Sequence, residues 1–394
     1  MDKIRNKLIF SLLIVALIPA LLIGGYGLYS TTNALGKSSE ERLKAKVESL
    51  ASSIESFLGN VYVDLFYLRD SSAVTNLYRA LASGSPDAVA SARKSLSQDF
   101  LSLSANREIY HQIRFLDTTG MEVVRVDRIR GMSKVVADDR LQNKKGRYYF
   151  DDTIAMTNGG VMISPLDLNR EKGVVEQPVR PTIRYATPVY DDHNNLRGML
   201  ILNVLASKFL DDINRSNAFG ETMAMVDSKG FYQAHIEPEK SWGSPADLNT
   251  GHSLVKDEPE LAAKVVNSPS AATLEIGDFM VSTSPIFADR ERKVLLGTLI
   301  DKVPNSVVYQ SVTSFKNVFV MIALLAIVIT VIIALVLAGS IANPIVYLTM
   351  ATHNMSKGNL NSKIEVNSND ETKDLAVAIE RLRKSMKILM DKYS

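Results

Sequence analysis

Two long apolar runs dominate the pattern of hydrophobic and polar positions along the chain. The first covers residues 8–29 without a charged residue, and the second covers residues 318–338, where Thr330 is the only polar side chain. At about 1.5 Å of rise per helical residue, about 20 residues cross the roughly 30 Å hydrocarbon layer of a membrane. The pattern therefore predicts two transmembrane helices, at residues 8–30 and 317–340.

The charges before the first run set the orientation that we expect. Three basic residues and one acidic residue precede it: Lys3, Arg5, Lys7 and Asp2. The positive-inside rule places such a basic end in the cytoplasm, and two spans return the C-terminus to the same side. We therefore expect residues 1–7 and the tail from residue 341 in the cytoplasm, with residues 31–316 outside it.

A cleavable signal peptide is the alternative interpretation of the first run, since basic residues before an apolar core also describe one. This run is longer than a usual signal core. Tyr26 and Tyr29 also stand where the outer aromatic belt of a membrane helix is expected. A membrane anchor is therefore favoured.

After the first run, apolar residues recur at steps of three and four, which lines one face of a long helix continuous with the first span. These residues are Leu43, Val47, Leu50, Ile54, Phe57, Val61, Leu65 and Leu68. Residues 83–86, Ser-Gly-Ser-Pro, break the pattern, and residues 87–103 predict a further helix.

From residue 108 the period changes to two, which predicts antiparallel strands. A first hairpin pairs strands at 109–116 and 121–127, and Arg114 is expected on the same strand face as Tyr110 and Gln112. Further strands are expected at 184–190, 196–204, 223–226, 231–235, 279–285 and 294–300, with a short helix at 209–215. The order of hairpins and helix occurs twice, so we predict an α+β fold with a distal module at about 85–215 and a proximal module at about 216–305.

The tail, residues 341–394, has a helix, a connector and a second helix. Pro344 is expected to open the first helix, in which Ile345, Leu348, Thr352 and Met355 share a face, and Gly358 to end it. The connector carries Leu360, Ile364 and Val366, and a heptad pattern follows at Leu375, Ile379, Leu382, Met386, Leu389 and Tyr393. Such seams predict a parallel four-helix bundle when two chains dimerise. A coincidental amphipathic tail is the alternative.

Composition excludes several function classes. The 45 basic and 43 acidic residues nearly cancel, so no overall field attracts nucleic acid. Without cysteine, the chain has no disulfide or thiol chemistry. The five histidines are scattered, and neither a phosphate-binding glycine loop nor a GxSxG motif is present. We therefore expect no metal, no cofactor and no enzyme active site in this chain.

Several strings in order resemble the double Cache sensor domains of bacterial histidine kinases, diguanylate cyclases and chemoreceptors, which are tandem PAS-like modules. The strings are YHQIRFLDTTGMEVVRVD, RYYFDDT and SPLDLNREKGVVEQPVRPTIRYATPVYDD in the distal module, and FYQAHIEPEKSW in the proximal one. The resemblance covers roughly residues 35–305 and implies a small ligand in the distal module.

The tail resembles a HAMP domain. Where that family usually has a hydrophobic residue and a glycine after Asp370 and Glu371, this chain has Thr372 and Lys373. The expected signal-transmitting residues of the tail are Pro344, Gly358, Leu360, Ile364, Glu371, Leu375, Ile379 and Leu382.

Polar residues on strand faces and covering loops are the candidates for ligand contact in a PAS-like pocket. They are Arg114, Arg125, Tyr148, Tyr149, Asp152 and Arg184. Guanidinium groups suit a carboxylate or phosphate, and together with tyrosine and aspartate they suit an anionic or zwitterionic ligand. For each residue a purely structural role is the alternative: Arg114 pairs with an acid, or the tyrosines belong to the core. The RYYF string lacks the tryptophan and spacing of the amino-acid-binding subclass, so an amino acid is not favoured.

These observations predict a homodimeric, multi-pass receptor of the bacterial inner membrane that binds a small solute outside and signals to a cytoplasmic partner. One alternative is the input half of a histidine kinase, diguanylate cyclase or chemoreceptor whose output domain is absent from this chain. The other is a membrane-tethered binding or adhesion module without signalling.

Overall fold

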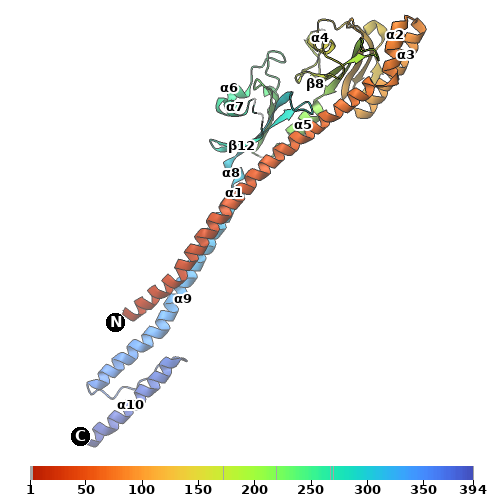
Figure 1. The fold of residues 1–394 in the computed structure, drawn as a ribbon. Helices are drawn as coiled ribbons and strands as arrows, with labels where there is room; N and C mark the ends of the chain where they lie inside the picture. Colours follow the sequence, from red (N-terminus) through yellow and green to blue (C-terminus); the bar gives the residue numbers. More distant parts are fainter. Residues whose placement is uncertain (1–2, 172, 219, 267, 269, 394) are drawn as a thin grey trace. The chain divides into compact units, whose positions relative to one another are not determined.

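The computed structural model describes residues 3–171, 173–218, 220–266, 268 and 270–393. Residues 1–2 of the expected cytoplasmic N-terminus and residue 394 of the expected HAMP domain lie outside the described residues. The chain divides into two compact units, residues 38–308 and residues 1–37 with 309–394. The larger one is named the sensor unit below, and each is described by itself (Figure 1).

Three helices begin the sensor unit (Figure 1). They are α1 (Lys3–Arg69), of which the part from Ser38 belongs to this unit, α2 (Ser72–Ser83) and α3 (Pro86–Arg107). The first and third pack on its first sheet, and the second packs against the third. The expected stripe of α1 is confirmed: Val47, Ile54 and Leu65 are buried. Ser71 starts α2 because its hydroxyl accepts a hydrogen bond from the Val74 amide at 3.3 Å. The sequence pattern did not predict this separate helix.

The distal sheet is antiparallel, with the order β3-β2-β1-β9-β8-β4, and β5 also pairs with β8. Its strands are β1 (Tyr110–Leu116), β2 (Glu122–Ile129), β3 (Met132–Val135), β4 (Met162–Ile163), β5 (Asp167–Leu168), β8 (Pro181–Tyr190) and β9 (Leu196–Leu205). The helix α4 (Tyr148–Ile154), the short hairpin β6 (Arg170–Glu171) and β7 (Val174–Val175) and the turn η1 (Asp138–Arg140) complete the module. All seven residues of β1 are buried, so both faces of the sheet are covered.

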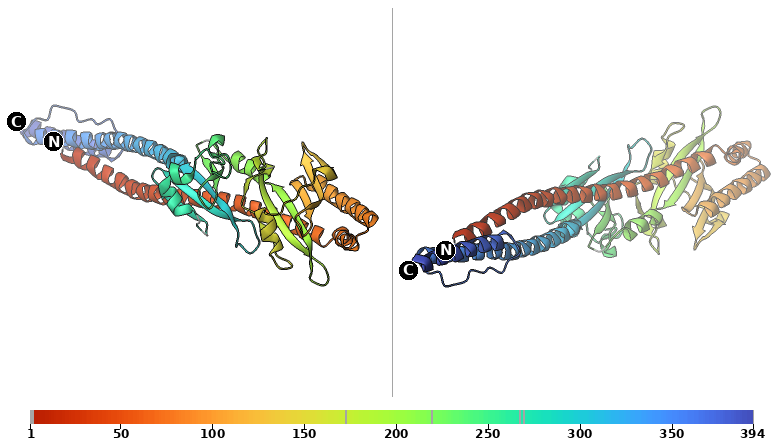
Figure 2. Two further views of the ribbon diagram at one scale, coloured as in Figure 1. Left: turned by 90° about the horizontal axis from the view of Figure 1, so that it is seen from above. Right: turned by 90° about the horizontal axis from the view of Figure 1, so that it is seen from below.

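The proximal module repeats this plan with a five-stranded antiparallel sheet in the order β11-β10-β14-β13-β12. The strands are β10 (Thr222–Val226), β11 (Tyr232–Ala234), β12 (Ala272–Ile276), β13 (Phe279–Phe287) and β14 (Leu295–Pro304). The helical elements are α5 (Ser207–Arg215), η2 (Pro238–Lys240), α6 (Leu254–Asp257), α7 (Pro259–Val265) and α8 (Asn305–Val308). In each sheet the first strand of the module's first hairpin pairs with its last long strand, β1 with β9 and β10 with β14. Figure 2 shows the two sheets following one another along α1.

The other unit contains the start of α1 together with α9 (Gln310–Ser356) and α10 (Glu371–Tyr393). Both α1 and α9 contain a stretch long and apolar enough to cross a membrane. The expectation that Pro344 opens a new helix is wrong, because α9 continues through it to Ser356. Proline inside a helix removes one backbone hydrogen bond, and its ring crowds the carbonyl four residues earlier. The helix α9 contains Pro344 in spite of both costs.

Candidate ligand-binding site

A cavity of about 180 Å³ lies on the face of the distal sheet opposite α1. Its floor is formed by Gln112 and Arg114 of β1, Arg184 of β8 and Asn203 of β9. Its cover is formed by residues 142–147, by Tyr149 of α4, and by Asn169, Arg170, Glu171 and Gly173. The segment 166–171 is named the strap from here on.

Arg114 is the most deeply placed cation of this cavity, with 2% of its surface exposed. Its Nη2 donates to Oδ1 of Asn203 at 2.8 Å, and its Nη1 donates to Oε1 of the buried Glu122 at 3.4 Å. Its Nε is buried and has no hydrogen-bond partner among the described residues. Since a buried, unpaired donor on a charged group costs free energy, this guanidinium retains capacity for an anionic partner.

Arg184 lies beside it and is 4% exposed. Its Nη1 donates to Oδ1 of Asp167 at 2.7 Å, and its Nη2 donates to Oδ1 of Asn169 at 3.2 Å. Burial alone would lower the pKa of Arg184, but the charge of Asp167 and its neighbours outweighs burial and raises it. Both acceptors belong to the strap.

Arg125 of β2 is 6% exposed and has three carboxylates around it. It donates to Asp127 at 2.7 Å and 2.9 Å and to Oε1 of Glu171 at 3.0 Å, and it lies 3.6 Å from Glu122. Burial raises the pKa of the Glu171 carboxyl, but the hydrogen bond from Gln112 and the charge of Arg125 outweigh it, so this pKa is lowered. Arg125 therefore holds the strap in place and does not itself line the cavity.

Tyr149 forms the apolar part of the cavity wall. Its ring is 5.6 Å from Cζ of Arg114, 5.9 Å from Cζ of Arg147 and 5.8 Å from Cζ of Arg184. Three cations on one aromatic ring form cation–π contacts that keep the guanidinium groups together in spite of their repulsion. Burial raises the pKa of the Tyr149 hydroxyl, but Arg114 and Lys144 outweigh it and lower that pKa.

Cations dominate the lining of the cavity, and the acids Glu122 and Asp167, which pair with Arg114 and Arg184, do not line it. Of its 14 lining residues, six are cationic and one, Glu171, is acidic. Burial lowers the pKa of Lys144, and the nearby charge of Arg114 lowers it further. A low-dielectric cavity with this excess of cations favours an anion over a neutral or cationic solute. Its volume is below the range of about 300–1,000 Å³ that is usual for drug-sized ligands, so the fitting solute is small.

The structure brings Arg114, Tyr149 and Arg184 together as cavity residues, with Arg125 behind the strap. Tyr148 is 43% exposed and its hydroxyl lies 3.4 Å from Nη1 of Arg184, on the side away from the cavity. Asp152 is exposed and does not line the cavity. At 3.6 residues per helical turn, α4 directs Tyr149 and Thr153 inward, and Asp152 therefore points outward.

The expectation that Tyr110 shares a face with Arg114 is wrong. The pairing of β1 with β9 shifts by one residue between Tyr110 and Gln112. Such a bulge turns the side chain of Tyr110 to the α1 side, where it joins the main core, while Gln112 and Arg114 face the cavity.

Sequence reasoning also missed part of the cover. The lining residues it omitted include Lys144, Lys145, Arg147, Asn169, Arg170 and Asn203. The run Lys144-Lys145-Gly146-Arg147, directly before the RYYF string's tyrosines, is a basic cluster in a predicted loop and was the available signal.

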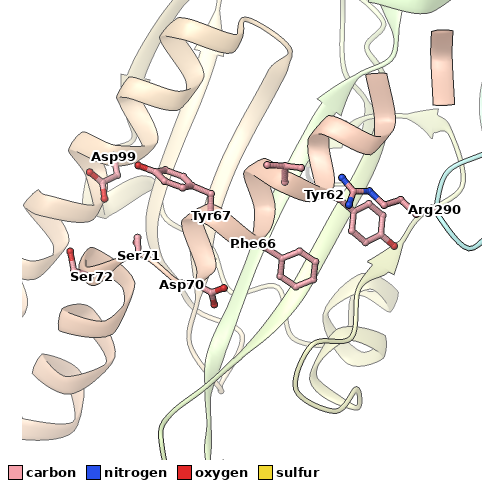
Figure 3. Close-up of a pocket in the computed structure, with 9 residues that line it drawn as sticks. Tyr62, Phe66, Tyr67, Asp70, Ser71, Ser72, Asp99 and Arg290 are labelled. Carbon is pink, nitrogen blue, oxygen red and sulfur yellow. The ribbon is translucent and has the colours of Figure 1, made fainter. Parts of the chain in front are cut away.

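A larger hollow of about 760 Å³ lies on the outer side of α1 (Figure 3). It is an open groove in which Tyr67 is 72% exposed, and its Asp70 is already paired with Arg69 at 2.6 Å. Its cation Arg290 is exposed, and its acids Asp70 and Asp99 disfavour an anion, so it has less capacity for a small anionic ligand than the smaller, buried cavity at Arg114.

In the tail, the expected connector residues Leu360 and Ile364 are 5% and 4% exposed and pack with Leu348, Met355 and Ala376. The Ile364 amide donates to Oε2 of Glu380 at 3.0 Å, and Arg383 donates to the Leu360 carbonyl. Gly358 follows the end of α9 in the left-handed region.

The second tail helix, α10, begins where Oδ1 of Asp370 accepts a hydrogen bond from the Thr372 amide at 2.9 Å. Glu371 stands in its first turn, Ile379 is partly buried against the cluster, and Leu375 and Leu382 are 47% and 53% exposed.

Two modules in series with a cationic cavity, followed by a helical tail, define the sensory input region of a signalling protein. The family model for the bacterial histidine kinase sensor domain matches residues 77–296, more than half of the chain, and the HAMP domain model matches residues 336–387. The chain belongs to the family of bacterial histidine kinase sensor domains. No curated protein matches the chain significantly in sequence.

Several solved structures share the fold of the sensor unit. The extracellular domain of a protein described as a histidine kinase has a TM-score of 0.60 and 21% identity, over 73% of this chain and 99% of its own. A domain of a sensory box/GGDEF family protein from Vibrio parahaemolyticus has a TM-score of 0.60 and 21% identity, over 70% and 99%. The sensory domain of a Campylobacter jejuni chemoreceptor with isoleucine bound has a TM-score of 0.50 and 11% identity, over 71% and 97%.

Proposed function

We propose that the cavity at Arg114 binds a small anionic solute, a carboxylate or phosphate compound, outside the cytoplasm. The observation that carries this proposal is the buried guanidinium of Arg114, whose Nε has no hydrogen-bond partner in the described part of the chain, in a cavity lined by six cations and one carboxylate. An anion is favoured over a zwitterion because Asp152, the acid expected to hold an ammonium group, lies outside the cavity, and Glu171 already accepts from Arg125 and Gln112.

The proposed path of the signal starts in the sensor unit and runs through α9. The proposed domains are a cytoplasmic N-terminus at 1–7, a first span at 8–30, the extracytoplasmic region at 31–316, a second span at 317–340 and a HAMP domain at 341–394. Leu375 and Leu382, exposed in the single chain, become the seam of a parallel four-helix bundle in a homodimer. Such a bundle can be bistable, as a switch requires.

Calorimetry on the full chain in nanodiscs tests the ligand class. The anions tested are inorganic phosphate and succinate. Alanine is the zwitterion, and glucose is the neutral solute. We expect heat of binding from an anion and none from glucose. Arg114→Ala and Arg184→Ala should each weaken anion binding by roughly ten- to a hundredfold, since hydrogen bonds to charged groups contribute about 1.5–3 kcal/mol.

Because Arg114 and Arg184 are buried, their substitution can disturb the fold as well as anion binding. Two exposed residues that line the cavity therefore provide a second test of binding. Lys145→Ala and Arg147→Ala should weaken the binding without affecting the fold, and Lys134→Ala on β3, exposed and outside the cavity, is the matched control. If Arg114→Ala and Arg184→Ala both leave binding unchanged, the site is placed wrongly.

Labelling of intact cells tests the proposed topology, because the chain has no native cysteine. We expect a membrane-impermeant maleimide to label His193→Cys in the exposed loop after β8 and to leave Lys387→Cys in α10 unlabelled until the cells are opened. The reverse result would contradict the orientation.

A further inference from the structure

Alternate residues of the strap accept hydrogen bonds from buried arginines of the distal sheet, and the residues between them bond to the proximal module. Asp167 and Asn169 accept hydrogen bonds from Arg184, at 2.7 Å and 3.2 Å, and Glu171 accepts from Arg125 at 3.0 Å. Each second residue of an extended chain points the same way, so these three acceptors face the arginines together.

The alternate residues of the strap bond to the proximal module. The Leu166 carbonyl accepts from Nε2 of Gln233 at 3.3 Å, and the Leu168 amide donates to Oδ1 of Asp247 at 3.1 Å. Nη2 of Arg170 donates to the Ala246 carbonyl at 2.5 Å. Three successive contacts therefore fix the strap to β11 and to the loop at residues 244–248.

We propose that the strap is the element by which the distal cavity controls the proximal module, and that Arg184 is its switch. This inference rests on the proposed function. Arg184 has one guanidinium group to share between Asp167 and a ligand anion. An anion in the cavity competes with Asp167 for it, and weakening of that ion pair moves the strap together with its contacts to Asp247 and Ala246.

The charge around the junction supports this competition. Asp167, Asp227 and Asp247 line a second hollow of about 500 Å³ between the modules, where Lys229 is the only cation among its lining residues. Arg184 is the hydrogen-bonded cation that compensates Asp167, ahead of the weaker charges of Arg170 and Arg147, while Asp247 and Asp167 repel each other. When the ligand forms the ion pair with Arg184, the repulsion between the carboxylates of Asp167 and Asp247 weakens the contact between the strap and Asp247.

The single tryptophan, Trp242, reports on the same loop. It is 8% exposed, and its carbonyl accepts a hydrogen bond from the Leu248 amide at 3.1 Å. Movement of residues 244–248 therefore changes both the fluorescence of Trp242 and the amide exchange of this loop.

The first test needs no ligand. Asp167→Asn keeps the shape of the side chain and removes its charge. In the full chain in nanodiscs, we expect amide exchange in residues 244–251 to become about tenfold faster and the fluorescence of Trp242 to change. Asp139→Asn, an exposed carboxylate of η1, is the control and should leave both unchanged. Unchanged exchange in Asp167→Asn, with the fold retained by circular dichroism, would overturn the proposed coupling.

The second test uses the anion that calorimetry identifies from inorganic phosphate and succinate. We expect it to produce the same exchange and fluorescence change in the wild type, and to bind several-fold more tightly to Asp167→Asn, where Arg184 is free of its competitor. Asp247→Ala, changed on the proximal side, should also alter anion affinity, because coupling between sites is reciprocal.

The outcomes separate the two proposals. If the anion binds but leaves exchange in residues 244–251 unchanged, the switch is overturned and the ligand site stands. If neither anion binds the wild type, the proposed function and the ligand-driven switch both fall, and the Asp167→Asn result alone then decides whether the strap couples the modules.

Discussion

The hydroxyl of Tyr110 donates a hydrogen bond to Oδ2 of Asp64 at 2.6 Å, which joins the first strand of the distal sheet to α1. Both groups are buried, and Arg107 of α3 donates to the other oxygen of the same carboxylate at 2.7 Å. Burial, and then the hydrogen bond to Asp64, raise the pKa of Tyr110 far above its ordinary value, so this hydroxyl stays a donor at every physiological pH.

Tyr110→Phe should therefore destabilise the sensor unit by about 2 kcal/mol, because a hydrogen bond to a buried charge is lost while Arg107 keeps the carboxylate paired. Urea unfolding followed by the fluorescence of Trp242 measures the change. Tyr67→Phe is the control: Tyr67 is 72% exposed, and its loss of a hydroxyl should change the unfolding free energy by less than about 0.5 kcal/mol. Equal effects of the two substitutions would refute the importance of this contact.

The position of Tyr110 also shows where sequence reasoning stopped. The period of two in residues 109–116 correctly predicted β1, since alternation follows from the geometry of any strand. No glycine or proline near His111 signals the bulge in the sequence. The bulge depends on the pairing of β1 with β9, some 90 residues further along the chain. The face of Tyr110 was therefore not predictable locally, whereas the stripe of α1 was.

The cavity was predictable to a similar degree. Arg114 and Arg184 lie on strands that the period of two predicted, Tyr149 lies on a helix that no pattern predicted, and all three line the cavity. Arg170 and Glu171 form a strand of two residues, and Asn169 lies between it and another two-residue strand, so these segments are too short for a period to appear. Their contribution to the site depends on contacts with Arg184 and Arg125 that only the folded chain provides.

Glu176, next to the cavity, predicts a dependence of stability on pH. Burial raises the pKa of its carboxyl, but hydrogen bonds from His111 and Asn169 and the charge of Arg180 outweigh burial and lower the pKa to about 2. Because the folded-state pKa lies below the ordinary value of 4.5, the stabilisation is fully present above about pH 4.5 and is lost as the pH falls toward 2.

Glu176→Gln should accordingly lower the unfolding free energy by about 1–2 kcal/mol at pH 7, because solvent screens this partly exposed carboxylate, and flatten its dependence between pH 4.5 and 2. Urea unfolding at a series of pH values checks both statements. Glu239→Gln, an exposed glutamate of η2, should keep the wild-type profile. A wild-type profile in Glu176→Gln would show that this carboxylate contributes no pH-dependent stability.

A buried ion pair connects α1 to the proximal sheet. Nζ of Lys46 lies 3.0 Å from Oδ2 of Asp301, which is 0% exposed, and 2.6 Å from Oε2 of Glu221. Burial raises the pKa of Asp301, and Lys46 only partly opposes this. Since the folded-state pKa is raised, the sensor unit gains stability as Asp301 becomes protonated at low pH and loses it as the pH rises through that pKa.

Lys46→Met should destabilise the sensor unit by about 3–5 kcal/mol at pH 7, because it leaves a buried charge uncompensated. The loss should become smaller as the pH is lowered. The double variant Lys46→Met with Asp301→Asn should recover most of the stability, and this thermodynamic cycle, measured by urea unfolding, isolates the pair. Additive losses in the double variant would contradict the coupling.

The exposed leucines of α10 lead to the last prediction. Leu375, Leu382 and Leu389 recur every seven residues and are 47%, 53% and 55% exposed in the single chain. A heptad seam of this kind is buried only against a second helix. Since the wild type contains no cysteine, single cysteines introduced in α10 crosslink only to their copies in a second chain.

In native membranes under mild oxidation, Leu382→Cys and Leu389→Cys should give disulfide-linked dimers at least about tenfold faster than Lys384→Cys. The disulfide requires Cα atoms roughly 4.4–6.8 Å apart, and Lys384 stands about 200° around the helix from Leu382, away from the seam. Equal rates at the three positions would exclude a parallel seam. A helix that carries a signal must differ in geometry between the two states. If addition of the anion changes the ratio of the Leu382→Cys and Leu389→Cys crosslinking rates, the bundle switches. An unchanged ratio would favour a tethered binding module without signalling.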